Sequence, residues 1–174
     1  MRTLRPLFVL LLGALVVSTP GTSNSGTADE ADAVIKLLDY VEWPAGAATD
    51  KDGALLISVI GDATTASQLK DLAAKRTADG KKTTVKAISL DDTLTNTQVL
   101  YFTTQDKTEL AKILKKVDSA PVLTVSNCEG FPRFGVMVGL FTEEGKVKFE
   151  VNTMVVRAGG LKISSQLLKL ARII

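Results

Sequence analysis

The sequence contains no histidine, and its 174 residues include a single cysteine, Cys128. Without histidine, neither a Ser-His-Asp nor a Cys-His arrangement can be assembled. One thiolate without imidazole also falls short of the four ligands of a Cys/His zinc site. No carboxylate or metal constellation stands out. We therefore expect no catalytic residue, no metal and no cofactor, and we do not expect an enzyme.

A lone cysteine also excludes an internal disulfide bridge. Cys128 lies in TVSNCEGFPRFG, residues 124–135, among small and turn-forming residues. A reactive thiolate needs a neighbouring cation or a helix N-terminus, whereas the adjacent Glu129 would raise the pKa of the thiol. We predict a half-buried thiol at the end of a strand, with a bridge to another chain as the minor alternative.

Neither sign of charge is in clear excess, because the chain has 21 basic and 19 acidic residues. The net charge therefore indicates no particular class of partner. Two of the basic residues, Arg2 and Arg5, lie in the first segment, and without them the two signs are equal. The basic stretches KKTTVK (81–86) and KILKK (112–116) are typical of solvated faces. We expect no nucleic-acid partner.

The N-terminus reads MRTLRPLFVLLLGALVVSTPGTSNSG, a basic, then apolar, then polar order that predicts a secretory signal peptide. Its apolar run, residues 7–17, is shorter than the roughly 20 residues that a transmembrane helix needs. No A-x-A site marks the cut, which we place between 18 and 28, and an uncleaved anchor is the alternative. We expect residues 1–27 to form a signal peptide and polar leader, and 28–174 a single domain without a transmembrane span.

Hydrophobic periodicity in the domain alternates between strand and helix patterns. It predicts helices at 30–41, 66–79 and 110–117, and strands at 54–62, 83–90, 98–104 and 120–127. The order after the first helix is strand, helix, strand, strand, helix, strand. This order is typical of a layered α/β domain with a mixed, mostly parallel sheet flanked by helices.

The last third of the chain changes pattern. VMVGLFTEEGKVKFEVN, residues 136–152, divides at 143–145 into two antiparallel strands near the sheet edge. On the second strand Val147, Phe149 and Val151 alternate with polar residues, which predicts one buried and one wet face. KISSQLLKLARII, residues 162–174, has the apolar spacing of a terminal amphipathic helix.

Two short motifs invite a chemical interpretation. SQLK, residues 67–70, matches S-x-x-K, but no S-D-N or K-T-G accompanies it, so chance is the better account. VIGDATT, residues 59–65, places Gly61 and Asp62 between a strand and a helix. An anion site at that helix N-terminus is one interpretation, and a helix cap by Asp62 or Thr64 is the simpler one.

Several longer stretches resemble the YfiR-like periplasmic proteins from about Ala31 to the C-terminus. They are YVEWP, ISVIGD, PVLTVSNCEGF, GLFTEEGKVKFEVN and LKISSQLLKLARII. The resemblance implies an α/β domain, often dimeric, in the periplasm of Gram-negative bacteria. It also implies a repressor that binds the sensor region of an inner-membrane protein such as a diguanylate cyclase. The best-studied members carry disulfides, so redox control by an internal bridge does not transfer to this chain.

For a partner contact, the loop FPRFG places Phe131 and Phe134 around Arg133, and aromatic residues with arginine are typical of interface anchors. The alternative is that both rings close the core and only Arg133 is exposed. Trp43 has the same two interpretations. Glu150 and Asn152, on the expected wet face, are partner contacts or merely solubilising.

A receptor for a small ligand, serving a sensor kinase or a transport system, is the second hypothesis. In parallel α/β sheets, ligands bind at the carboxyl ends of the strands. Here Asp62, Thr104 and Asn127 would form that crevice.

Overall fold

The computed structural model describes residues 25–47, 52–118 and 120–174. The apolar run at 7–17 lies outside these residues, so the signal peptide stays a prediction. The first half of the chain forms α1 (Ser25–Leu37), a 3-10 turn η1 (Leu38–Tyr40), β1 (Val41–Glu42), β2 (Leu55–Ile60), α2 (Ala63–Ala78), β3 (Thr83–Ala87) and β4 (Val99–Phe102). The second half forms α3 (Lys107–Lys116), β5 (Leu123–Ser126), a 3-10 turn η2 (Phe131–Phe134), β6 (Val138–Glu143), β7 (Lys146–Val151), α4 (Thr153–Ala158), β8 (Lys162–Ile163), α5 (Ser165–Leu168) and β9 (Arg172–Ile173).

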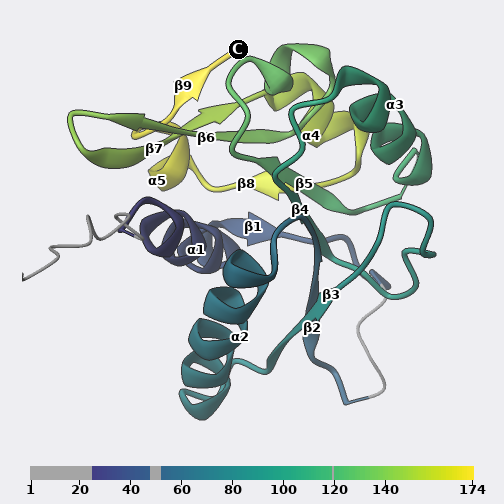
Figure 1. Ribbon diagram of the computed structural model, residues 1–174, viewed down its shortest axis with the longest axis vertical. Coiled ribbons are helices and arrows are strands. Elements are labelled where there is room, and N and C mark those ends of the chain that lie inside the picture. Colours follow the sequence, from purple (N-terminus) through teal and green to yellow (C-terminus); the bar gives the residue numbers. More distant parts are fainter. Residues whose placement is uncertain (1–24, 48–51, 119) are drawn as a thin grey trace, which may run out of the picture.

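A seven-stranded sheet in the order β3-β2-β4-β5-β6-β7-β9 organises the fold (Figure 1). All neighbouring strands are parallel except β6 and β7. Strands β1 and β8 form a separate antiparallel pair. The predicted α/β class, the mostly parallel sheet and the C-terminal antiparallel hairpin are confirmed.

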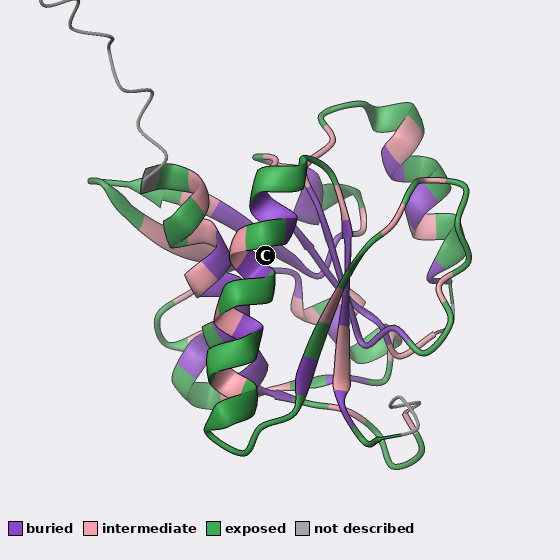
Figure 2. Cartoon of the chain, turned by 60° about the horizontal axis from the view of Figure 1, so that its bottom comes forward, coloured by how far each residue is buried: buried purple, intermediate pink, exposed green. Residues whose placement is uncertain are grey.

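The core lies on both faces of the sheet, because the central strands β2, β4 and β5 carry buried apolar side chains. On β4, Val99 and Tyr101 contribute to a cluster under α1 and α2, whereas Leu100 and Phe102 contribute to a second cluster under α3 and η2. Figure 2 shows the central strands as buried and the outer faces of the helices as exposed. This burial on both faces is expected of parallel strands.

The hairpin turns at Glu144 and Gly145, both of which have positive φ, 51° and 71°. A two-residue turn with this conformation matches the twist of antiparallel strands. It sets Leu140 opposite Phe149, and Phe149 packs against the first cluster with its neighbours Val147 and Val151. The predicted turn and the predicted core face of β7 are therefore confirmed.

The terminal helix is much shorter than the sequence pattern predicts. Ser164 caps α5, accepting from the Leu167 backbone N–H at 3.4 Å, but the helix covers only Ser165–Leu168. Arg172 and Ile173 instead pair with β7, and the Ile174 N–H donates to the Val151 carbonyl at 3.0 Å. The open edge of β7 satisfies these backbone groups, which is why the helix does not continue.

Candidate partner-binding surface

Turn η2 presents the FPRF segment as one rigid 3-10 turn. Gly130 and Gly135, at either end, have φ of 80° and 109°, a conformation that favours glycine. Pro132 is buried, and its carbonyl accepts from the Asn152 side-chain amide at 2.9 Å. Pro132 also packs so closely on β6 that a Cβ at Gly139 would lie 2.7 Å from its ring. The turn is thus held by the sheet beneath it.

The two phenylalanines of η2 differ in burial. Phe131 is 4% exposed and belongs to the second cluster, whereas Phe134 is 56% exposed. The Lys107 ammonium lies 4.9 Å from the centre of the Phe134 ring, and Arg133 is exposed beside it. Neither interpretation from the sequence holds for both rings, because Phe131 closes the core and Phe134 is exposed.

A groove of about 430 Å³ lies between α3 and α4, next to η2. Its walls include Leu114 from α3, Val155 from α4 and Gly135 directly after Phe134. Met154, which precedes Val155, is 74% exposed. The exposed Phe134 and Met154 are therefore chain neighbours of groove residues. We call η2 with this groove the η2 surface.

Glu150 and Asn152 do not lie on a wet face, so that prediction is wrong. Glu150 is 5% exposed and Asn152 is 8% exposed. Pro132 covers this face of the hairpin, and β9 runs beside it, with an Arg172 nitrogen 3.8 Å from a Glu150 oxygen. Asn152 caps α4 through the Val155 N–H at 3.1 Å. Both residues hold the fold together beneath the η2 surface.

Trp43 is half-buried and packs against the first cluster. Its indole N–H donates to the Gln98 carbonyl at 3.3 Å. The ring also lines a pocket at the amino ends of β2 and β3 that holds Arg76, Lys81 and Lys82. The structure brings Trp43 to these cations and not to η2.

At the carboxyl ends of the strands, the polar residues expected to form a crevice already have partners within the fold. Asp62 caps α2, with one carboxylate oxygen accepting from the Thr65 N–H at 2.8 Å. Thr104 donates to the Glu109 carboxylate. The Asn127 amide donates to Glu30 at 3.0 Å. The cap interpretation of VIGDATT is confirmed, with Asp62 as the capping residue.

The same edge is tightly packed between β2 and β4. The helices that follow these two strands, α2 and α3, cover opposite faces of the sheet. A Cβ on Gly61 would collide with the Thr103 hydroxyl. The buried Tyr101 hydroxyl donates to Glu30 at 3.1 Å. Burial, with the Glu30 carboxylate nearby, raises the pKa of Tyr101, so its hydroxyl remains a donor. This edge is built for packing.

Cys128 lies just after β5 and is half-buried, as predicted. Burial raises the pKa of its thiol, which disfavours the thiolate that a nucleophile needs. In the ranges 25–47, 52–118 and 120–174, no group of acidic or thiol side chains has the arrangement of a metal site. None of the helices described there is long and apolar enough to cross a membrane.

Sequence reasoning missed Lys107, Arg76, Lys81 and Lys82 as site residues. Lys107 follows the cap residue of α3, and nothing in the sequence pairs it with Phe134. The two adjacent lysines of KKTTVK are a weak signal, because short basic stretches of this kind are typical of solvated faces.

Solved structures confirm the fold class. An ABC domain in complex with L-Trp from Streptococcus pneumoniae has a TM-score of 0.54 at 12% identity over 85% of this chain and 60% of that one. A conserved domain protein from Vibrio cholerae O1 biovar El Tor has a TM-score of 0.52 at 12% identity, over 84% and 59%. The chain therefore spans about three fifths of each structure's length. At this identity the likeness concerns the fold alone.

Comparison with curated proteins finds no match. The sequence family described as YfiR/HmsC-like, in contrast, matches residues 28–172. This range holds every strand of the sheet except the last residue of β9, as well as the whole η2 surface. The chain belongs to the YfiR/HmsC-like family.

Proposed function

We propose that this protein is an exported regulator that binds the periplasmic sensor region of an inner-membrane signalling protein and holds it inactive. A diguanylate cyclase is the partner that the family resemblance favours. The observation that carries the proposal is the family match over residues 28–172, because this family is in general periplasmic and regulatory. The basic and apolar N-terminus supports export.

The η2 surface is the proposed contact. An exposed aromatic ring beside an exposed arginine has the composition of interface hot spots. Pro132, the two flanking glycines and the Asn152 hydrogen bond fix the turn before any partner arrives. A preformed turn loses little conformational entropy on binding, so more of the contact energy appears as affinity.

The receptor alternative finds less support at its expected place. Internal hydrogen bonds already occupy the side-chain polar groups of Asp62, Thr104 and Asn127. A ligand at the carboxyl edge would have to break them. A regulator that acts through a protein contact fits this edge better.

The cellular experiment measures cyclic-di-GMP. Deleting the gene should raise it, and restoring the full-length chain should lower it again. A chain without residues 1–27 should fail, because its contact surface would remain in the cytoplasm. Unchanged cyclic-di-GMP after deletion would rule out a cyclase partner.

The contact experiment uses Arg133→Glu combined with Phe134→Ser. Both side chains are exposed, so the fold should survive, and partner binding should weaken by about 2 kcal/mol or more. Lys169→Glu combined with Leu170→Ser is the matched control, because it changes one exposed lysine and one exposed apolar residue that do not belong to η2 or line its groove. Equal affinity of the two folded double variants would place the interface elsewhere.

A homodimer, which the resemblance implies, is part of the proposal. Sedimentation of the mature protein at several concentrations measures it directly. A monomer at all concentrations would remove the dimer and leave the regulator proposal intact.

A further inference from the structure

The pocket beside Trp43 combines an aromatic wall with three cationic side chains. It has a volume of about 430 Å³ and lies where β2 and β3 begin. Its walls are the Trp43 ring, Pro44, Leu55 and Gln98 together with three cations, Arg76, Lys81 and Lys82. None of the described residues that line it is acidic.

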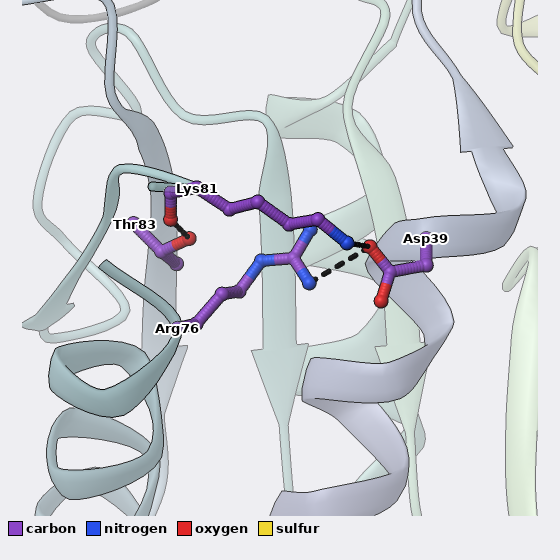
Figure 3. Close-up of polar contacts among 4 residues, drawn as sticks. All are labelled: Asp39, Arg76, Lys81 and Thr83. Atoms are coloured by element: carbon purple, nitrogen blue, oxygen red, sulfur yellow. Dashed lines mark hydrogen bonds and ion pairs between the residues drawn. The ribbon is translucent and has the colours of Figure 1, made fainter. Parts of the chain in front are cut away.

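The cations outnumber the carboxylates that neutralise them. Within the described residues, Asp39 is the one carboxylate that forms an ion pair with any of the three (Figure 3). A single Asp39 oxygen contacts both Arg76, at 2.9 Å, and Lys81, at 2.7 Å. Burial alone would raise the pKa of Asp39, but hydrogen bonds from Lys81 and Arg76 lower it, so the carboxylate stays charged.

Lys82 adds a further positive charge. Its ammonium donates to the Asp52 backbone carbonyl at 3.2 Å, a contact that neutralises no charge. The Arg76 side chain is 12% exposed, and its buried Nε has no hydrogen-bond acceptor. A buried donor without an acceptor is costly. Among the described residues, the positive charge and the donor groups of these three side chains exceed the groups that pair with them.

The aromatic wall of the pocket is set in place. The Trp43 N–H bonds to the Gln98 carbonyl, and the Gln98 side-chain oxygen accepts from the Leu56 N–H at 2.6 Å. Gln98, directly before β4, therefore links the indole of Trp43 to β2. A flat apolar face fixed beside excess cations suits a ligand that is flat at one end and anionic at the other.

We propose that this pocket binds a small organic anion in which a carboxylate or phosphate group is attached to a flat ring. Lys81 and Lys82 contact the oxyanion, Arg76 adds its charge, and the ring lies against Trp43. Asp39 competes with the ligand for Arg76 and Lys81. The site does not depend on the η2 surface, so it is tested separately from the regulator proposal.

The first test compares probes on the purified mature protein. Calorimetry measures phenyl phosphate, benzoate and phenol, and fluorescence measures inorganic phosphate, since Trp43 is the only tryptophan. We expect saturable binding of an aryl anion, weaker binding of inorganic phosphate and none of phenol. The tighter aryl anion identifies the preferred acid group. No saturable binding of either aryl anion up to about 10 mM, or equal binding of phenol, overturns the proposal.

The second test uses variants with opposite expected signs. Lys81→Gln with Lys82→Gln should raise the Kd for the aryl anion by about tenfold or more, because two charge-assisted contacts are lost. Asp39→Asn should lower the Kd by about threefold, since the competing carboxylate becomes neutral. Lys86→Gln, an exposed lysine on β3 outside the pocket, should leave the Kd unchanged.

The melting transition of each variant shows that it is folded. A folded lysine double variant that binds as the unchanged protein does would overturn the site, and so would weaker binding by a folded Asp39→Asn. The opposite signs separate a charged pocket from a general loss of structure, which weakens binding in every variant.

Discussion

The polar residues at the two ends of the parallel strands differ in how far they are paired within the fold. At the carboxyl ends, Asp62, Tyr101 and Asn127 are each bonded within the fold, and Gly61 packs on Thr103. At the amino ends, Lys81 and Lys82 stand beside Trp43 with more charge than Asp39 neutralises. Ligands of open α/β sheets commonly bind at the carboxyl ends, yet in this protein that end is the packed one.

The difference suggests that the carboxyl ends contribute to stability and the amino ends to binding. Substitutions at the carboxyl end should lower the free energy of unfolding, because each removes a satisfied contact or creates a clash. Substitutions at the amino end should barely change it and should alter anion binding instead. The following predictions test that contrast, from the largest expected effect to the smallest.

Gly61→Ala should cost about 3 kcal/mol or more of the free energy of unfolding, measured by urea denaturation. The new Cβ meets the Thr103 hydroxyl, and the residue has a φ of +155°. Adding Thr103→Ala should recover the part due to the clash and leave the part due to the backbone. A single variant as stable as the unchanged protein would show that the strand ends are not tightly packed.

The sequence predicts the layers of this fold well, because they follow from local periodicity. The helix with Leu110 and Ile113, the strand from Val99 and the turn at Gly145 all form where apolar spacing and turn residues place them. Strand order and the pairing of β7 with β9 are absent from such patterns, since they depend on which edge remains open. For that reason the apolar spacing predicts a longer terminal helix than α5, which ends after one turn.

The candidate sites follow less directly from the sequence. The alternation in β7 assigns Glu150 to a solvent-exposed face. Pro132, which lies 18 positions earlier in the chain, covers that face, and the local pattern contains no information about this contact. The pocket gathers Asp39, Trp43, Arg76 and Lys81 from separate segments, so no local motif announces it. In FPRF, composition indicates an anchor, but only the tertiary fold decides that Phe134 is the exposed ring.

Asp62→Ala should cost about 1 kcal/mol at neutral pH, through the loss of the cap on α2. The hydrogen bond from the Thr65 N–H lowers the pKa of Asp62 in the folded protein. Its contribution is therefore complete above the unfolded pKa, about 3.9, and is lost as the pH falls through the lower folded value.

Denaturation of the Asp62 variants at pH 7 and pH 3 measures this effect. The difference between the unchanged protein and Asp62→Ala should shrink at the lower pH. Asp62→Asn, which keeps a capping oxygen without the charge, should remain near the unchanged protein at pH 7. A gap that stays constant with pH would mean that the carboxylate is not the cap.

Lys82→Gln should change the free energy of unfolding by no more than about 0.5 kcal/mol, because the side chain is exposed and lies in a cationic pocket. Its one hydrogen bond, to the Asp52 carbonyl, is weakly held against water. Relief of repulsion from the other two cations opposes that loss, and added salt should therefore stabilise the unchanged protein slightly more than the variant. Thermal denaturation at low and high salt measures both quantities. A loss of about 2 kcal/mol would make Lys82 part of the packed structure and would erase the contrast between the two strand ends.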